Sequence, residues 1–368
     1  MTPSDRLSLW TFGDAHVGTD LTYGRRSLAE AIGHSERGGD EGGQPFDWDL
    51  AIDLGDMSGG QLPPEDDEGQ LLVDQFAESL REHSREQVYS LGGNHDRNAP
   101  HEPSGWWWER WVDPLGDHPE LSRVDRANRP YAIEGTWERY SFQVGNMLFL
   151  MMSDINEPTQ EVGRGELGGN PGGVVSGETF RWWVDMVESN QDKIIVSAHH
   201  YMLKNTTVAS GPWEGMRQVD GKWVTHYHGY KERGTPEGAS YLYWVDSVPD
   251  AEAFESYLAE HPGAIDLWLG AHTHTHPDDT YGDKSHIEQK WGVWFVNAGA
   301  LTNHHGHTCM PMSRVWDIDG DTARVRCYLH TSDHAPQGWY PPAERTLQLS
   351  KPFRWGSADG NATERNEQ

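Results

Sequence analysis

Basic residues are scarce in this sequence. Its 368 residues include 29 Lys and Arg against 58 Asp and Glu, a formal net charge of -29, and its first lysine is Lys193. A chain without a basic stripe has nothing to exchange for the counterions of duplex nucleic acid, so we exclude that partner. The acid excess is spread along the whole chain, which predicts a strongly solvated surface suited to saline surroundings.

Cysteine is scarcer still. The two cysteines, Cys309 and Cys327, have neither a CxxC spacing nor the spacing of a disulfide framework. We therefore expect two buried thiols, with no redox or metal role. Any metal ion that the chain binds must be held by nitrogen and oxygen ligands.

Long apolar runs are also lacking. No segment approaches the roughly 20 apolar residues of a membrane-spanning helix. The first residues, MTPSDRLSLWTFGDAH, contain no basic region, apolar segment or cleavage site of the kind found in a secretory signal. From the sequence we expect no membrane partner and a cytoplasmic location.

Strand-like and helix-like segments do alternate along the chain. With 35% hydrophobic residues it can bury the core of one large α/β domain. We expect strands at 7–16, 48–57, 87–96, 193–200 and 265–274, helices at 23–34, 68–83 and 176–190, a hairpin at 139–154, and antiparallel strands between 293 and 330. The expected domain spans 1–355, with a substrate-side insertion at about 204–247 and a flexible tail at 356–368.

Polar side chains follow five of these strands, in the motifs GDAH, LGDM, GGNHD, SAHH and GAHTH. Loops beyond the carboxyl ends of strands in α/β folds converge on one crevice, so these side chains are expected to meet. A single polar strand end means little, because a buried Asp or His often caps a loop backbone. Five in succession favour a metal centre, and the candidate residues are Asp14, His16, Asp56, Asn94, His95, His199, His272 and His274.

The chain resembles the calcineurin-like metallophosphoesterase family in a series of motifs that have the same order and the same strand–loop contexts: Asp14-x-His16, Gly55-Asp56, Gly93-Asn94-His95-Asp96, His199 and His272-x-His274. The resemblance covers the chain from about Leu7 to Ile318. The family usually has glycine before its last histidine pair, where this chain has Ala271. The repeated histidines leave a shifted pair, His274 and His276, as an alternative. In AHHY the first histidine, His199, sits at the family's ligand position.

The resemblance implies a four-layer αββα sandwich of two mixed β-sheets flanked by helices, with two metal ions at the carboxyl-terminal edge of the strands. By the same resemblance, one ion is held by Asp14, His16 and His274, the other by Asn94, His199 and His272, and Asp56 bridges them. Two divalent ions bring four positive charges, of which two aspartates and a bridging hydroxide cancel three, so the site stays positive for a phosphate. Imidazole and carboxylate ligands without thiolate fit Mn, Fe or Zn.

The GNHD motif implies further roles. His95 resembles the family's non-ligand histidine, which donates a proton or hydrogen bond to the phosphate, and Asp96 would orient it. Arg97 fits either a phosphate contact or a surface salt bridge. Further candidates for contact with a substrate are Trp106, Trp107, His200 and His304, although tryptophans at this spacing also pack helices onto sheets.

Together these residues predict a phosphoester hydrolase in which a metal-bridging hydroxide attacks phosphorus in line. We favour a phosphodiesterase acting on a small organic phosphodiester, because the GNHD form and the bulky loops resemble that branch of the family. A phosphomonoesterase or nucleotide pyrophosphatase is the alternative, but it needs more cations than the few Arg and Lys near the motifs supply. A non-catalytic scaffold of the same fold is disfavoured because no ligand is missing. The substrate, the metal and the oligomeric state stay open.

Overall fold

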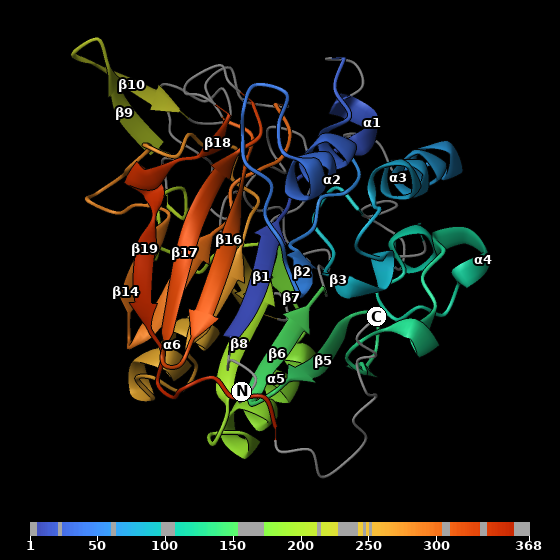
Figure 1. Ribbon diagram of the computed structural model, residues 1–368. Coiled ribbons are helices and arrows are strands. Elements are labelled where there is room, and N and C mark those ends of the chain that lie inside the picture. The colour runs from blue at the N-terminus through green and yellow to red at the C-terminus, as the bar shows by residue number, and fades with distance from the viewer. Residues whose placement is uncertain are drawn as a thin grey trace, which may run out of the picture.

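The computed structural model is an α/β structure built around two β-sheets that lie against each other (Figure 1). It describes residues 6–20, 24–59, 64–96, 107–153, 173–211, 215–226, 242–245, 248–249, 252–303, 310–331 and 337–356. Each of the two large sheets has seven strands in this part of the chain, and each mixes parallel with antiparallel neighbours. The expected fold, two mixed sheets with helices, is confirmed.

The first sheet carries the N-terminal strands, and its order is β18-β17-β16-β1-β2-β3, with β19 paired to β17. Its strands are β1 (Arg6–Phe12), β2 (Leu50–Asp53), β3 (Val88–Ser90), β16 (Met312–Asp319), β17 (Thr322–Leu329), β18 (Gly338–Trp339) and β19 (Arg345–Gln348). β1, β2 and β3 are parallel, and their crossovers contain α2 (Ser27–Arg37) and α3 (Asp66–Ser79). β16 and β17 pair antiparallel, as the sequence predicted for this region.

The second sheet has the order β14-β15-β13-β8-β6-β5-β4. Its strands are β4 (Glu134–Gly135), β5 (Arg139–Val144), β6 (Met147–Met152), β8 (Ile194–His199), β13 (Leu267–Gly270), β14 (Ile287–Lys290) and β15 (Val293–Asn297). β6, β8, β13 and β15 are parallel, while β5 forms the predicted hairpin with β6. α5 (Gly177–Ser189) begins with the predicted serine cap, because the Ser176 hydroxyl accepts from the N–H of Thr179 at 3.1 Å.

The remaining elements are short. They are the helices α1 (Val17–Asp20), α4 (Pro119–Ser122) and α6 (Glu252–Glu260), the π-helix η3 (Trp108–Val112), the 3-10 helices η2 (Arg85–Gln87), η4 (Arg126–Asn128) and η6 (Pro341–Ala343), and the strands β7 (Gly173–Val175), β9 (Gly215–Val219), β10 (Lys222–His226), β11 (Leu242–Val245) and β12 (Val248–Pro249). The β9–β10 hairpin lies within the predicted insertion. That insertion and the domain limits stay predictions, and the predicted tail from 357 onward lies outside the described residues.

The core explains the layer order. Buried side chains of both sheets meet in one cluster, which includes Leu9 and Ile52 from the first sheet and Phe149 and Val196 from the second. A second cluster packs α2 and α3 on the outer face of the first sheet, and a third packs α5 and α6 on the outer face of the second. Helices therefore cover both outer faces. The loops that follow the parallel strands emerge at the carboxyl ends of those strands, where a site can form.

The structure also bears on the sequence predictions about the cysteines and about membrane-spanning helices. Cys327 is a buried free thiol, whereas Cys309 lies outside the described residues. In the part of the chain that the structure describes, the helices are too short or too polar to cross a membrane.

Candidate metal centre

The first group of potential metal ligands comes from the ends of β1 and β13. His274 Nε2 lies 3.1 Å from Asp14 Oδ1, and His16 Nε2 lies 3.7 Å from the same oxygen. The ligand atoms of these three buried residues all lie within 4.8 Å of one another. The structure thus brings together three residues that the sequence assigned to one ion.

The second group comes from the ends of β2, β8 and β13. It contains Asp56, His200 and His272, whose ligand atoms also lie within 4.8 Å of one another. His200 Nε2 is 3.1 Å from Asp56 Oδ2 and 3.2 Å from His272 Nδ1. Asn94, which follows β3, has its Oδ1 3.2 Å from His200 Nε2, so the amide of the GNHD motif points into this group.

Asp56 lies between the two groups. Its Oδ2 is 3.1 Å from His200 Nε2 in the second group and 3.8 Å from His16 Nε2 in the first. A carboxylate at this place can ligate both ions, which is the bridging position that the sequence assigned to Asp56.

The second group fits a cation because its acceptors face one another. His200 Nδ1 lies 2.6 Å from the carbonyl oxygen of Leu54, so this nitrogen carries the hydrogen and donates it. In the neutral ring, Nε2 then turns a lone pair toward Asp56 Oδ2 and Asn94 Oδ1. Burial lowers the pKa of His200, but the Asp56 carboxylate, the Asp14 charge and the bond to Leu54 together raise it, to about 10. A proton therefore competes with a metal ion for this place, and the residues fit the ions that the resemblance implies.

The structure places His200, and not His199, in the second group. His199 is the last residue of β8, and its Nδ1 accepts a hydrogen bond from the N–H of Tyr201 at 3.0 Å. Burial lowers the pKa of His199, as does the neighbouring His200 ring, to about 3, so it is a neutral core side chain. The geometry thus adds His200, a substrate candidate from the sequence, to the potential ligands, and the ligand role of His199 stays a prediction.

His200→Ala should therefore cost the protein one ion, whereas His199→Ala should leave both bound. Both rings are fully buried, so the two variants remove the same side chain from similar surroundings. Loss of a ligand should exceed the roughly 10- to 100-fold loss of affinity that outer partners of a metal site cause. Titration of the metal-free variants with Mn²⁺ in the presence of a competing chelator measures this, and a loss in His199→Ala alone would return His199 to the ligand set.

The register of the last histidine pair is also visible in the geometry. His272 and His274 belong to the two groups. The backbone N–H of His276 instead donates to Asp279 Oδ2 at 2.9 Å in the following turn. The shifted pair, His274 and His276, therefore does not match the arrangement of the side chains.

Asp96 holds the backbone of the site. Its Oδ2 accepts from the N–H of Gly93 at 2.7 Å and of Asp56 at 2.9 Å, and its Oδ1 accepts from the N–H of Ser58 at 2.9 Å. Burial raises the pKa of Asp96, as does the Asp56 charge, to about 7, and the N–H donors oppose that rise. These bonds tie the loop after β2 to the loop after β3. The structure thus gives Asp96 a backbone-holding role, and its predicted orientation of His95 stays a prediction.

His95 lies at the edge of the first group. Its backbone N–H donates to Asp56 Oδ1 at 2.8 Å, and its ring meets the His16 ring edge to face, with centroids 4.8 Å apart. The side chain is 4% exposed. Its ring is therefore held against the first ligand group by its contact with His16.

The ligand loops have an unusual backbone. Four ligands have a positive φ: Asp14 (53°), His16 (46°), Asp56 (58°) and His272 (68°). Non-glycine residues adopt this left-handed region uncommonly, and such residues cluster at functional sites. Gly93 is required beside them, because a Cβ there would lie 2.1 Å from Asp56 Oδ1.

Ala271 replaces the family's glycine without crowding the site. A Cβ built on Gly13 would lie 2.7 Å from the Cβ of Ala271, so the glycine at 13 supplies the space that the alanine takes. The alanine at 271, after β13 of the second sheet, is thus compensated by the glycine at 13, after β1 of the first sheet.

Three of the substrate candidates, Arg97, Trp106 and His304, lie outside the described residues. Trp107 is fully buried, and its Nε1 donates to the carbonyl oxygen of Glu65 at 2.9 Å. It packs in the outer core of the first sheet, together with Trp108 and Trp111. The structure therefore favours the packing role that the sequence left open for Trp107.

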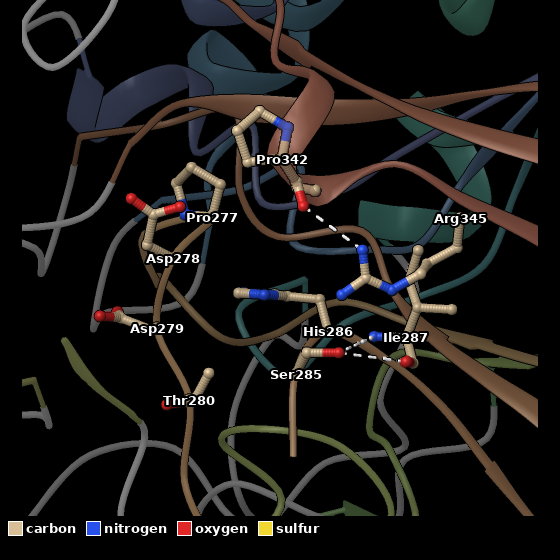
Figure 2. Close-up of a pocket in the computed structure, with 10 residues that line it drawn as sticks. Pro277, Asp278, Asp279, Thr280, Ser285, His286, Ile287, Pro342 and Arg345 are labelled. Carbon is tan, nitrogen blue, oxygen red and sulfur yellow. Dashed lines mark hydrogen bonds between the residues drawn. The ribbon is translucent and has the colours of Figure 1, made fainter. Parts of the chain in front are cut away.

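The structure has a cavity of about 170 Å³ that none of the candidate metal ligands line. Figure 2 shows the His286 ring among the side chains that line it. Its lining residues are Pro277, Asp278, Asp279, Thr280, Ser285, His286, Ile287, Pro342, Ala343 and Arg345. The cavity is thus separate from the candidate metal centre, and nothing in the sequence analysis predicted it.

Fold and site together define a two-sheet α/β sandwich that gathers Asp, Asn and His side chains at its strand ends, the architecture implied by the resemblance to calcineurin-like metallophosphoesterases. No protein-family model matches the chain, and no curated protein matches it. Solved structures similar to it include an uncharacterized protein from Streptococcus pneumoniae described as a predicted phosphoesterase, with 10% identity, a TM-score of 0.35, and coverage of 93% of this chain and 98% of that one.

Two further solved structures are similar at the same low level. Vacuolar Protein Sorting 29 from Cryptosporidium parvum has 12% identity and a TM-score of 0.37, with 93% of this chain and 98% of that chain covered. GAP50, described as the anchor in the inner membrane complex of Plasmodium, has 10% identity and a TM-score of 0.45, with 94% and 90% covered. Likeness at this level carries no argument about function, which must come from the site.

Proposed function

We propose that this chain is a metal-dependent phosphoester hydrolase. The observation that carries the proposal is the position of Asp56, whose Oδ2 lies 3.1 Å from His200 of one ligand group and 3.8 Å from His16 of the other. Two groups that share a carboxylate suit a pair of ions. Such a pair would activate water and neutralise phosphoryl oxygens.

The residues around these groups have separate tasks. Asp14, His16 and His274 would hold one ion, and Asp56, Asn94, His200 and His272 would hold the other, with Asp56 shared. Most of these ligands are neutral, so two divalent ions would keep a positive charge that attracts an anionic ester. The His95 ring would donate a proton to the leaving oxygen.

We infer a phosphodiester of a small organic molecule as the substrate class. Among the described residues, the ion pairs of Asp14 and Asp56 are all with histidines. Arg25, on the loop beside the centre, is engaged with Asp20 and Glu30. A diester carries one negative charge and needs less cationic support than the dianion of a monoester, so the charges favour a diester.

The metal-loaded protein should hydrolyse bis(p-nitrophenyl) phosphate with a higher kcat/KM than p-nitrophenyl phosphate. Both substrates release the same nitrophenolate, so the leaving group is constant while the charge on phosphorus and the number of aryl groups differ. Steady-state kinetics on protein reconstituted separately with Mn²⁺, Fe²⁺ and Zn²⁺ measures it, and chelator-treated protein is the control. Activity that survives removal of all metal would refute the hydrolase proposal, whereas the reverse preference would move it to a monoesterase.

A further inference from the structure

The turn that carries His272 and His274 has a second side that the metal ligands do not use. In the sequence HTHTH the histidines at 272 and 274 turn toward Asp14 and Asp56, and the threonines between and after them turn the other way. Thr273 and Thr275 are both buried. Each of their hydroxyls meets a buried polar side chain from the β14–β15 region of the second sheet.

Asn297 contacts the first of these hydroxyls. It is the last residue of β15, it is fully buried, and its Nδ2 donates to Thr273 Oγ1 at 2.6 Å. Its own Oδ1 accepts from the N–H of Gly299 at 2.8 Å, which fixes the orientation of the amide. A buried amide with both ends bonded has one orientation, so it can hold Thr273 in one place.

His286 contacts the second hydroxyl. Its Nε2 lies 2.8 Å from Thr275 Oγ1, and its carbonyl oxygen accepts from the N–H of Asn297 at 2.9 Å. Burial lowers the pKa of His286 well below its usual range, and the charge of Arg314 adds to this, so the ring is neutral. The two supports are therefore joined through the backbone, and neither carries a charge that would oppose the metal ions.

Arg314 anchors this pair from the first sheet. It is a fully buried residue of β16, and its Nε donates to the carbonyl oxygen of Asn297 at 3.4 Å. Among the described residues, no carboxylate lies within ion-pair distance of its guanidinium. Its bond to Asn297 links the first sheet to the end of β15 in the second, and its Nη1 donates to the carbonyl oxygen of Ala343 in η6 at 3.5 Å.

We propose that Asn297 and His286 are positioning residues that fix the metal-binding turn through Thr273 and Thr275. The inference rests on the proposed metal-dependent function. Asn297 and His286, with their bonds to the two threonines, are called the clamp below. The turn carries His274 of the first ligand group and His272 of the second, so the clamp sets the geometry of both groups. His272 has a left-handed backbone with φ 68°, which the clamp would hold in place when no ion is bound. Its loss should therefore weaken both ions together.

The two side chains of the clamp, Asn297 and His286, differ in their surroundings. Asn297 has no exposed surface, whereas the His286 ring lines the cavity of about 170 Å³ shown in Figure 2. A polar cavity of this size has room for water. In His286→Ala, water could replace the lost bond to Thr275 Oγ1, so this variant should lose less metal affinity than Asn297→Ala.

The decisive experiment measures metal affinity and not rate. Asn297→Ala and Thr273→Val should each weaken both ions by about tenfold, at the lower end of what outer partners of a metal site contribute. Thr273→Ser keeps the hydroxyl and should retain wild-type affinity. The double variant should lose no more than either single one, because both remove the same contact. Affinities come from Mn²⁺ titration of the metal-free full chain against a competing chelator.

Asn146→Ala is the matched control. Its Nδ2 donates to the carbonyl oxygen of Pro352 at 3.0 Å and its Oδ1 accepts from the N–H of Arg354 at 2.8 Å, so this amide is also bonded at both ends, but it lies in the β5–β6 turn at the opposite end of the sheet. It should lower the melting temperature of the metal-free chain without changing metal affinity. Asn297→Ala should change affinity by more than its effect on that melting temperature explains.

The outcomes separate the two proposals. Wild-type protein that binds two ions while Thr273→Val and Asn297→Ala bind them equally well would overturn the clamp and leave the hydrolase proposal standing. Wild-type protein that binds no ions would overturn both. Weakening of one ion alone would also refute the clamp, because the turn supplies a ligand to each group.

Discussion

Asp56→Asn should remove both metal ions at once. Its carboxylate is the side chain that faces both ligand groups, at 3.1 Å from His200 and 3.8 Å from His16. Asn keeps the shape and tolerates the positive φ of this position, but it removes the negative charge that both ions share. The loss of affinity should exceed the roughly 10- to 100-fold effect of outer partners, and it should appear in both binding steps. Elemental analysis and Mn²⁺ titration measure it.

Asp53→Asn is a suitable control for that variant. Asp53 lies at the end of β2, three residues earlier, and is fully buried. Burial raises its pKa well above the usual range, and the charge of Asp96 adds to this, so the loss of its charge should matter less than at Asp56. Its Oδ1 accepts from the N–H of Gly55 at 3.0 Å, a bond that Asn can keep. This control should bind both ions. Full occupancy in Asp56→Asn would remove Asp56 from the shared position.

His95→Ala should keep both ions and lose about 10²- to 10⁴-fold in rate, the usual contribution of a positioned proton donor. Alanine retains the backbone bond from residue 95 to Asp56 Oδ1, so the ligand geometry survives the change. The loss should be larger for alkyl esters, whose leaving oxygen needs a proton, than for nitrophenyl esters. Metal content together with kcat for the two ester types measures both parts.

Asn94→Ala is the companion to that variant. Its Oδ1 lies 3.2 Å from His200 Nε2, so its loss should lower the occupancy of one ion. An equal rate loss for both ester types in His95→Ala would point to charge stabilisation in place of proton donation. Loss of metal in His95→Ala would show that the two neighbours in GNHD have been assigned in the wrong order.

The sequence predicted the fold and most of the site because strand ends in α/β sheets have a fixed direction. Asp14, Asp56 and Asn94 follow parallel strands of one sheet, and His272 follows a parallel strand of the other, so their loops meet at one edge. The prediction needed no side-chain geometry. It depended on buried strands that end in metal-binding residues.

The choice between His199 and His200 could not be made from the pattern. Within β8 successive side chains alternate between the two faces of the sheet. The strand ends at His199, so the direction of the His200 side chain does not follow from this alternation. Which ring turns toward Asp56 is decided by the contact of His200 Nδ1 with Leu54 O at 2.6 Å, a bond to another strand end. A long-range contact of this kind has no local signal in the sequence.

The tryptophans after GNHD show a second limit. The sequence left open whether Trp107 packs or binds. The structure places a π-helix at Trp108–Val112, which changes the side chains that share a face. Trp111 lies against α3 at Gly69, where a Cβ would come within 2.2 Å of its ring. The need for that glycine follows only from the packed structure.

The left-handed ligands Asp14, His16, Asp56 and His272 have a consequence for the amount of protein in a cell. Backbone of this kind costs on the order of 1–3 kcal/mol per residue, which the rest of the fold must offset. Ions that bind the folded chain alone would add about 2.7 kcal/mol at a hundredfold excess over Kd. Changes of about 1–2 kcal/mol alter cellular abundance several-fold. Metal starvation should therefore deplete the protein through degradation, beyond the loss of its activity.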